Sequence, residues 1–186
     1  GSSVATRLHV DMAELKMLPI SNIVGPENDG WRVAKYLLEF ERGGSSVATR
    51  LHVDMAELKM LLDRVEGEDA LKGRAKEIGI KISALSQMET DMQSKIARGE
   101  KPGAGSSLMK IMASTLGQEI STIKMEAIGN YSLPHNNLLL LNKEVTIGEP
   151  EHQTISAGYL NDRASTVFGG AREVQKNIIA KSVLGL

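Results

Sequence analysis

The sequence has no cysteine, few aromatic residues and nearly balanced charges. The lack of cysteine excludes disulfides and thiolate metal ligands, and the four histidines lack a ligand-like spacing with carboxylates, so we expect no metal site. The 22 Lys and Arg against 23 Asp and Glu include no basic block, which argues against nucleic acid as a partner. No apolar run approaches the ~20 residues of a membrane span, and the start does not resemble a signal peptide. We therefore expect a cytoplasmic protein without a membrane partner.

Alanine, leucine, isoleucine and methionine are plentiful, and these residues favour helix. Clusters of glycine and proline separate segments of periodic apolar residues, and such segments predict helices. The predicted helices cover residues 30–41, 46–65, 69–98, 106–129 and 155–166, with a terminal helix after Ala171. We predict an all-α fold over residues 31–186, an up-and-down four-helix bundle with extra short helices.

Residues 1–18 repeat residues 44–61 without a single difference. An old repeat would have diverged, and a solenoid would show a regular array of repeats. A recent duplication or an artefact of cloning or tracing explains the identity, and we favour the artefact. We therefore assign no function to residues 1–18.

The first predicted helix places a carboxylate in register with its apolar face. Trp31, Ala34 and Leu38 recur at spacings of three and four, and the next position on that face is Glu41. Loss of solvent there would raise the pKa of Glu41 and suit it to act as a base near neutral pH. Alternatively, Glu41 lies at a fraying helix end, paired in water with Arg42 or Arg50.

The other helices carry apolar residues at the same spacings, which predicts their buried faces. The predicted buried residues are Val47, Leu51, Met55, Leu58, Leu62 and Val65, then Leu71, Ala75, Ile78, Ile82, Leu85, Met92 and Ile96, then Leu108, Met112, Leu116, Ile120, Ile123 and Ala127, and finally Val174, Ile178, Ile179 and Val183.

The most specific stretch is the last one, residues 163–186, which reads RASTVFGGAREVQKNIIAKSVLGL. A turn of small residues after Phe168 leads directly into a helix, where glycines let a ligand approach the backbone and free N–H groups favour negative charge. This stretch resembles the closing segment of the acyl-CoA dehydrogenases, FAD-dependent oxidoreductases of fatty acid metabolism whose turn lies beside the flavin and the acyl chain. Residues 19–30 are similar to the segment by which that family leaves its middle β-domain.

The resemblance implies a base, because the family removes a proton from the carbon next to a thioester and passes a hydride to FAD. One branch carries its base where this sequence has Gly169, which has no side chain. Another branch carries a Glu-Arg pair on the first helix of this domain, which here is Glu41 and Arg42. The implied roles are Glu41 as the base, Phe168, Gly170 and Arg42 at the substrate site, and Ala171, Arg172, Glu173 and Glu126 at FAD.

The resemblance also implies partners, namely an acyl-CoA substrate, an electron-transfer acceptor protein and further subunits in a homo- or hetero-oligomer, as a dimer or tetramer. Ala171 stands where the family often has a hydroxyl, which indicates a divergent branch. Two alternatives remain at this point. One is a non-catalytic assembly subunit of the same fold, and the other is a helical interaction bundle without a cofactor.

Overall fold

The structure is a computed structural model that describes residues 19–41, 47–133, 149 and 152–186. The chain divides after Phe40 into two compact units. In the first unit, a short 3-10 turn, η1 (Ile20–Asn22), precedes α2 (Gly30–Glu41). Residues 19–29, within the segment similar to the exit from the family's β-domain, therefore form a turn and loop without a strand. Asp29 directly precedes α2, and its carboxylate accepts a hydrogen bond from Arg32.

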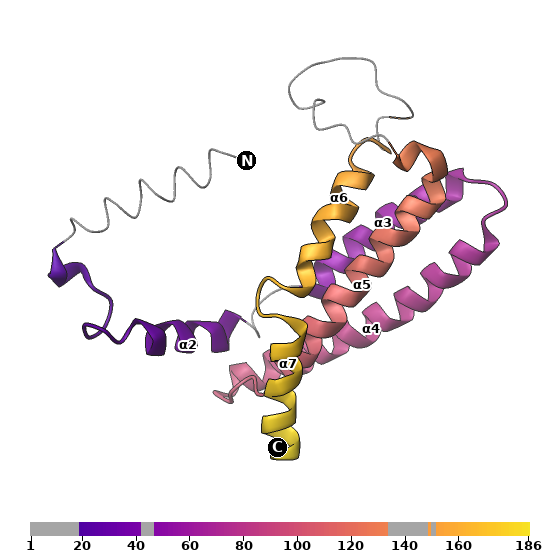
Figure 1. Cartoon of the computed structure of the whole chain (residues 1–186). Helices are drawn as coiled ribbons and strands as arrows, with labels where there is room; N and C mark the ends of the chain where they lie inside the picture. The colour runs from indigo at the N-terminus through magenta and orange to yellow at the C-terminus, as the bar shows by residue number, and fades with distance from the viewer. Residues whose placement is uncertain (1–18, 42–46, 134–148, 150–151) are drawn as a thin grey trace. The chain divides into compact units, whose positions relative to one another are not determined.

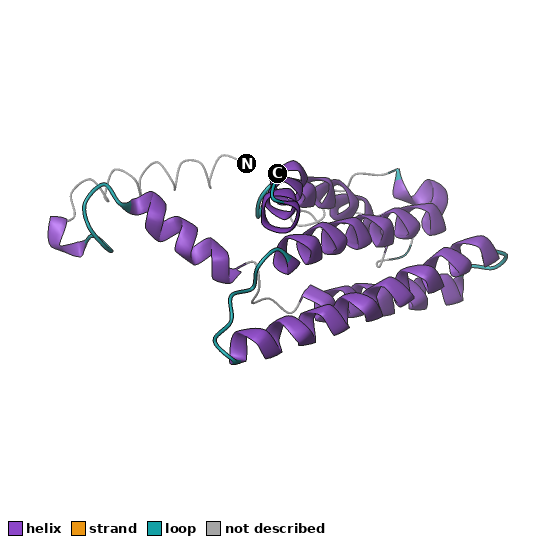
Figure 2. Cartoon of the chain, turned by 90° about the horizontal axis from the view of Figure 1, so that it is seen from below, coloured by secondary structure: helices purple, strands orange, loops and turns teal. Residues whose placement is uncertain are grey.

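The second unit consists of helices whose bounds agree closely with the predicted ones. They are α3 (Val47–Arg64), α4 (Asp69–Ala97), α5 (Gly105–Ile128), η2 (Gly129–Ser132), α6 (Ile155–Asp162), η5 (Arg163–Thr166), α7 (Arg172–Ile179) and the π-helical η6 (Ala180–Leu184). The predicted fifth helix is thus α6 followed by a 3-10 turn. The described residues contain no strand, as Figure 2 shows.

The three long helices α3, α4 and α5 pack against one another, and α6 and α7 pack in succession along α5. In Figure 1 the long helices run up, down and up, and α6 and α7 return downwards beside α5. The tight connection of residues 65–68 enforces the antiparallel arrangement of α3 and α4. The predicted all-α up-and-down bundle is confirmed. Among the described residues, no helix is both long and apolar enough to cross a membrane.

The core lies between α3, α4 and α5 and is built from the predicted stripes. The buried hydrophobic residues are Ala48, Leu51, Met55, Leu58, Leu61, Leu62, Leu71, Ala75, Ile78, Ile82, Leu85, Met92, Met109, Leu116, Ile120, Ile123, Ala127 and Ile128. Packing of side chains that recur at helical spacing explains why the pattern predicted all of them except Ala48, Leu61, Met109 and Ile128.

Three residues that were predicted to be buried are exposed: Val174 on α7, Val183 on η6 and Leu108 near the start of α5. Leu108 is exposed, whereas Ser106, Ser107 and Met109 are buried. The cause is a close approach of two helices, because a Cβ at Gly105 would lie 2.8 Å from the Met92 Cε atom. The start of α5 therefore turns its small residues towards α4 and Leu108 away from it.

We predict that Ile123→Ala lowers the free energy of unfolding by about 2–5 kcal/mol, because Ile123 is fully buried and the substitution leaves a cavity. Urea denaturation followed by circular dichroism measures this change. Ile80→Ala on α4 is the matched control, since Ile80 is 73% exposed, and it should change the free energy by no more than ~0.5 kcal/mol. Equal effects of the two variants would contradict the described core.

Candidate functional site

The turn between η5 and α7 depends on two consecutive glycines. Gly169 has φ +69° and Gly170 has φ +98°, a region of backbone conformation that residues with a Cβ rarely adopt. The N–H groups of Val167 and Phe168 both donate to the carbonyl of Ala164 and close the end of η5. The glycines then reverse the chain so that α7 starts immediately after Ala171.

The start of α7 is open to a ligand with hydrogen-bond acceptors. Ala171 is the N-cap residue of α7, and no side chain of the described residues caps the free N–H groups of the first turn. Phe168, next to the glycines, is 57% exposed. A helix start of this kind favours a negatively charged or acceptor group, because the free N–H groups and the helix dipole both point towards it.

Helix α5 holds the segment before the turn through side chains that bond to backbone. The Lys110 Nζ atom donates to the carbonyl of Ser165 at 3.1 Å, and the Gln118 Nε2 atom donates to that of Asp162 at 2.9 Å. Arg163 returns the contact by donating to the Ser121 hydroxyl at 3.0 Å and to the carbonyl of Gln118 at 3.3 Å. These bonds fix η5, and therefore the turn, against a helix of the core.

Two cationic side chains lie beside the start of α7. Arg172 donates from its NH2 atom to the Thr115 hydroxyl at 3.1 Å, while its Nε atom is buried without a partner among the described residues. Burial lowers the pKa of Lys110, nearby Arg172 lowers it further, and Glu173 opposes the shift. A cofactor with acceptor groups, such as the phosphates and ring edges of FAD, fits this open helix start and the unpaired guanidinium nitrogen.

Glu126, which the resemblance also predicted at FAD, lies apart from this turn. Glu126 forms an ion pair with Arg74 across α4 and α5 and is exposed. It follows Thr115 by three turns of α5, which is about 16 Å of helix rise, so it does not meet the turn within one chain. Glu41 is the last residue of α2, and its side chain and Arg42 lie outside the described residues. Within the described part of the chain, no group of three His, Asp or Glu residues could hold a metal ion.

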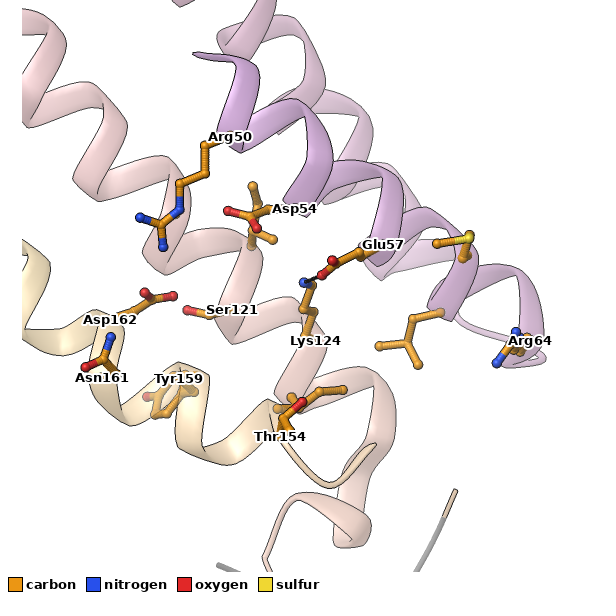
Figure 3. Close-up of a pocket in the computed structure, with 16 residues that line it drawn as sticks. Arg50, Asp54, Glu57, Arg64, Ser121, Lys124, Thr154, Tyr159, Asn161 and Asp162 are labelled. Carbon is orange, nitrogen blue, oxygen red and sulfur yellow. Dashed lines mark hydrogen bonds and ion pairs between the residues drawn. The ribbon is translucent and has the colours of Figure 1, made fainter. Parts of the chain in front are cut away.

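A groove between α3, α5 and α6 was not predicted from the sequence. Its volume is about 620 Å³, and Gly117 on α5 and Gly158 on α6 leave room for it. Figure 3 shows charged residues of α3 facing polar residues of α6 across α5. Lys124 binds Glu57 at 2.8 Å across the groove. The alternation of charges along α3 was the available signal, but it is also typical of an ordinary solvated helix face.

Sequence reasoning also missed the polar residues that support the turn. Lys110, Thr115 and Gln118 lie on α5 between the predicted core residues, and each bonds to the segment 162–172. Gln175 on α7 is almost fully buried, whereas Val174, which was predicted to face inward, is about half exposed. Spacing predicted the buried faces of α3, α4 and α5 but gave no signal for these polar contacts.

We predict that Asp54→Asn raises stability at pH 7 but not at pH 3. Burial raises the pKa of Asp54 above its ordinary 3.8, and Lys124 and Arg50 only partly offset that shift. The folded protein therefore binds this proton more tightly than the unfolded chain, so the contribution of Asp54 to the free energy of unfolding falls as the pH rises from 3.8 through its folded-state pKa. Urea titrations at several pH values measure the difference. If the difference in the free energy of unfolding between the variant and the wild type became smaller as the pH rises, the raised pKa of Asp54 would be contradicted.

We predict that Gln118→Ala frees the segment before the turn while leaving the core helices folded. The substitution removes the amide that bonds the carbonyl of Asp162 and the hydroxyl of Ser165, at a cost of about 1–2 kcal/mol. Hydrogen exchange should accelerate in η5 and α6 but not in α4. Gln87→Ala is the control, because Gln87 bonds only within its own helix, to Asp91. Faster exchange throughout the chain would argue against a local tether.

Comparison with known proteins agrees with this geometry. Residues 28–184 match the model of the family described as acyl-CoA dehydrogenase, C-terminal domain. Acyl-CoA dehydrogenase IpdE1 of Mycolicibacterium smegmatis is 29% identical over 170 residues, which cover 88% of this chain and 38% of that protein. Acyl-CoA dehydrogenase FadE34 of Mycobacterium tuberculosis is 26% identical over 186 residues, all of this chain but 23% of that protein. The chain thus spans less than half the length of these relatives.

Solved structures share the fold at lower sequence identity. The ChsE4-ChsE5 complex from Mycobacterium tuberculosis superimposes with a TM-score of 0.69 at 22% identity, over 91% of this chain and 43% of that one. The Tcur3481-Tcur3483 steroid ACAD gives 0.72 at 18% identity, over 91% and 43%. The FAD complex of PigA gives 0.70 at 17% identity, over 91% and 42%. Because the family match extends from α2 to the end of η6, the chain belongs to the acyl-CoA dehydrogenase C-terminal domain family.

Proposed function

We propose that this chain acts as the C-terminal domain of an FAD-dependent acyl-CoA dehydrogenase, an oxidoreductase that introduces a double bond between the α and β carbons of an acyl-CoA thioester. The observation that carries the proposal is the uncapped start of α7 after the double-glycine turn, within a chain that matches the family over residues 28–184. The curated relatives named acyl-CoA dehydrogenases and the FAD complex of PigA support the same activity and cofactor.

FAD, when bound, supplies the acceptor for the two electrons of the reaction. In the proposed site, the free N–H groups at Ala171, Arg172 and Glu173 hold acceptor groups of the cofactor, as does the Arg172 guanidinium. The proposed acyl site borders Phe168 and Gly170. Bonds from α5 to residues 162–165 keep this turn in place, so the reacting groups need little reorganisation.

Glu41 is the proposed base and takes the proton from the carbon next to the thioester carbonyl. Gly169 offers no alternative, because it has no side chain and its φ of +69° disfavours one. Arg42 is proposed to lie at the substrate site beside Glu41. Glu126 is proposed to act at the flavin of a neighbouring subunit, which accords with its exposed position away from the turn.

The ChsE4-ChsE5 complex and the Tcur3481-Tcur3483 steroid ACAD, each named for two proteins, support a hetero-oligomer as the assembly. They also favour a second candidate function, in which this chain is an assembly subunit that completes an active partner. The steroid ACAD among the neighbours makes a steroid-derived acyl group a candidate substrate beside a fatty acyl group. An electron-transfer protein is the proposed acceptor in either case.

We predict that Glu41→Gln in the flavin-loaded protein lowers kcat by about 10²–10⁴-fold, because the amide cannot accept the α-proton. Steady-state turnover with an artificial electron acceptor measures the loss, and the flavin absorbance reports whether FAD is retained. Glu77→Gln, an exposed position on α4, is the matched control and should keep full activity. Unchanged kcat in Glu41→Gln would favour the assembly subunit, and a protein that never binds flavin would refute both forms of the proposal.

A further inference from the structure

A buried glutamine on α7 contacts both glycines of the turn. Gln175 is only 1% exposed, although Val174 and Lys176 on either side of it are exposed. Burial of an amide costs free energy unless both its donor and its acceptor find partners. The inner face of α7 therefore carries a polar group where an apolar residue would be the cheaper choice.

The hydrogen bonds of Gln175 are incomplete. Its Nε2 atom donates to the carbonyl of Gly169 at 3.4 Å, while its Oε1 atom is buried and has no partner among the described residues. A methionine of similar length would fill the same space without an unpaired acceptor. The stability of the fold therefore does not explain why residue 175 has an amide side chain. We attribute the amide to its hydrogen bond with the carbonyl of Gly169 in the turn.

The side chain of Gln175 occupies the space that a side chain at position 170 would need. A Cβ added at Gly170 would overlap the Nε2 atom of Gln175, whereas a Cβ added at Gly169 meets no described atom within 4 Å. Both glycines have positive φ, so both positions are strained for alanine, but only Gly170 is also closed by the amide. Gln175 thus holds one glycine by a hydrogen bond and the next by direct contact.

We propose that Gln175 is a positioning residue that sets the shape of the Phe168–Ala171 turn and so places the turn against the reacting groups. This inference rests on the proposed function for its catalytic consequence, but the contact itself does not. The amide binds the inner side of the turn, at the carbonyl of Gly169, and leaves Phe168 and the first N–H groups of α7 free for substrate and cofactor.

The first test uses the full chain and needs no cofactor. Gln175→Met should lower the protection of the bonded Val167, Phe168 and Gln175 amides against hydrogen exchange by about tenfold, with the α4 amides unchanged. In Gln175→Glu, burial raises the pKa of the new carboxyl. The protonated acid still donates to the carbonyl of Gly169, so at pH 5 the turn amides of this variant should be protected against exchange nearly as well as in the wild type. As the pH rises and the proton is lost, their protection should fall by up to tenfold per pH unit. Equal protection in all three proteins would overturn the proposal.

A double-mutant cycle separates the contact from backbone strain. Gln175→Ala removes the amide, so it should relieve part of the cost of Gly170→Ala and none of the cost of Gly169→Ala. The expected coupling with Gly170 is at least about threefold in the unfolding equilibrium constant, measured by urea titration. If the effects of Gln175→Ala and Gly170→Ala on the unfolding equilibrium constant were simply additive, Gln175 would not restrict position 170, and the proposed contact would be refuted.

The second test asks for the catalytic consequence in the flavin-loaded protein. Gln175→Met should keep its FAD, shift the visible flavin absorption, and lower kcat by about 10–100-fold with a smaller change in KM, because the turn is displaced while binding persists. Gln175→Glu at low pH should recover part of that loss. A variant with lower stability but unchanged kcat and flavin spectrum would assign Gln175 a purely structural role. If the wild type itself lacks turnover, the proposed function is refuted. The hydrogen-exchange measurements and the double-mutant cycle would still show whether Gln175 holds the turn.

Discussion

The positions of the core and of the turn before α7 both depend on α5. One face of this helix packs against apolar residues of α3 and α4, and polar side chains on its other face hydrogen-bond to the segment before the turn. Leu116, Ile120 and Ile123 fill the core against α3 and α4. On the other face, Lys110 and Gln118 reach the carbonyl groups of the segment that leads to α7. Burial of an apolar side chain contributes about 1.5–3 kcal/mol, and a hydrogen bond nets about 1 kcal/mol. The core therefore sets where α5 lies, and the weaker polar bonds set where the turn lies on it.

The sequence was sufficient for the parts of the fold that depend on periodicity. Each long helix carries a regular apolar stripe, and glycine or proline clusters separate the helices, so their bounds could be read closely. The exception at Leu108 has a local cause, because the small residues of α5 allow an approach to Met92 that no spacing rule contains. The turn was also identifiable, since two adjacent glycines with positive φ are a local requirement of the backbone.

The polar contacts of the site could not be read in the same way. Gln175 bonds a carbonyl six residues earlier, and this is possible only once the glycines have reversed the chain. Lys110 and Gln118 meet partners more than forty residues away in the sequence. The groove beside Asp54 likewise forms from three helices that are distant in sequence. Such contacts follow from tertiary packing, and the resemblance supplied the roles of Ala171 and Arg172 without supplying the bonds that orient them.

The contrast between apolar packing in the core and single hydrogen bonds at the turn also indicates how such a site can change between members of a fold family. A core held by many apolar contacts tolerates few changes in volume, whereas a turn held by single hydrogen bonds can shift when one polar partner is replaced. Among the described residues, Arg172 has one guanidinium nitrogen and Gln175 one amide oxygen that are buried without a partner. Both groups cost the bundle stability and both lie at the turn. Among the described residues, the Ser107 hydroxyl and the His152 Nδ1 atom are also buried without a partner, so the turn holds two of the four such groups. Two unpaired polar groups at one turn, beside an apolar core, are the pattern expected where ligand placement constrains the residues.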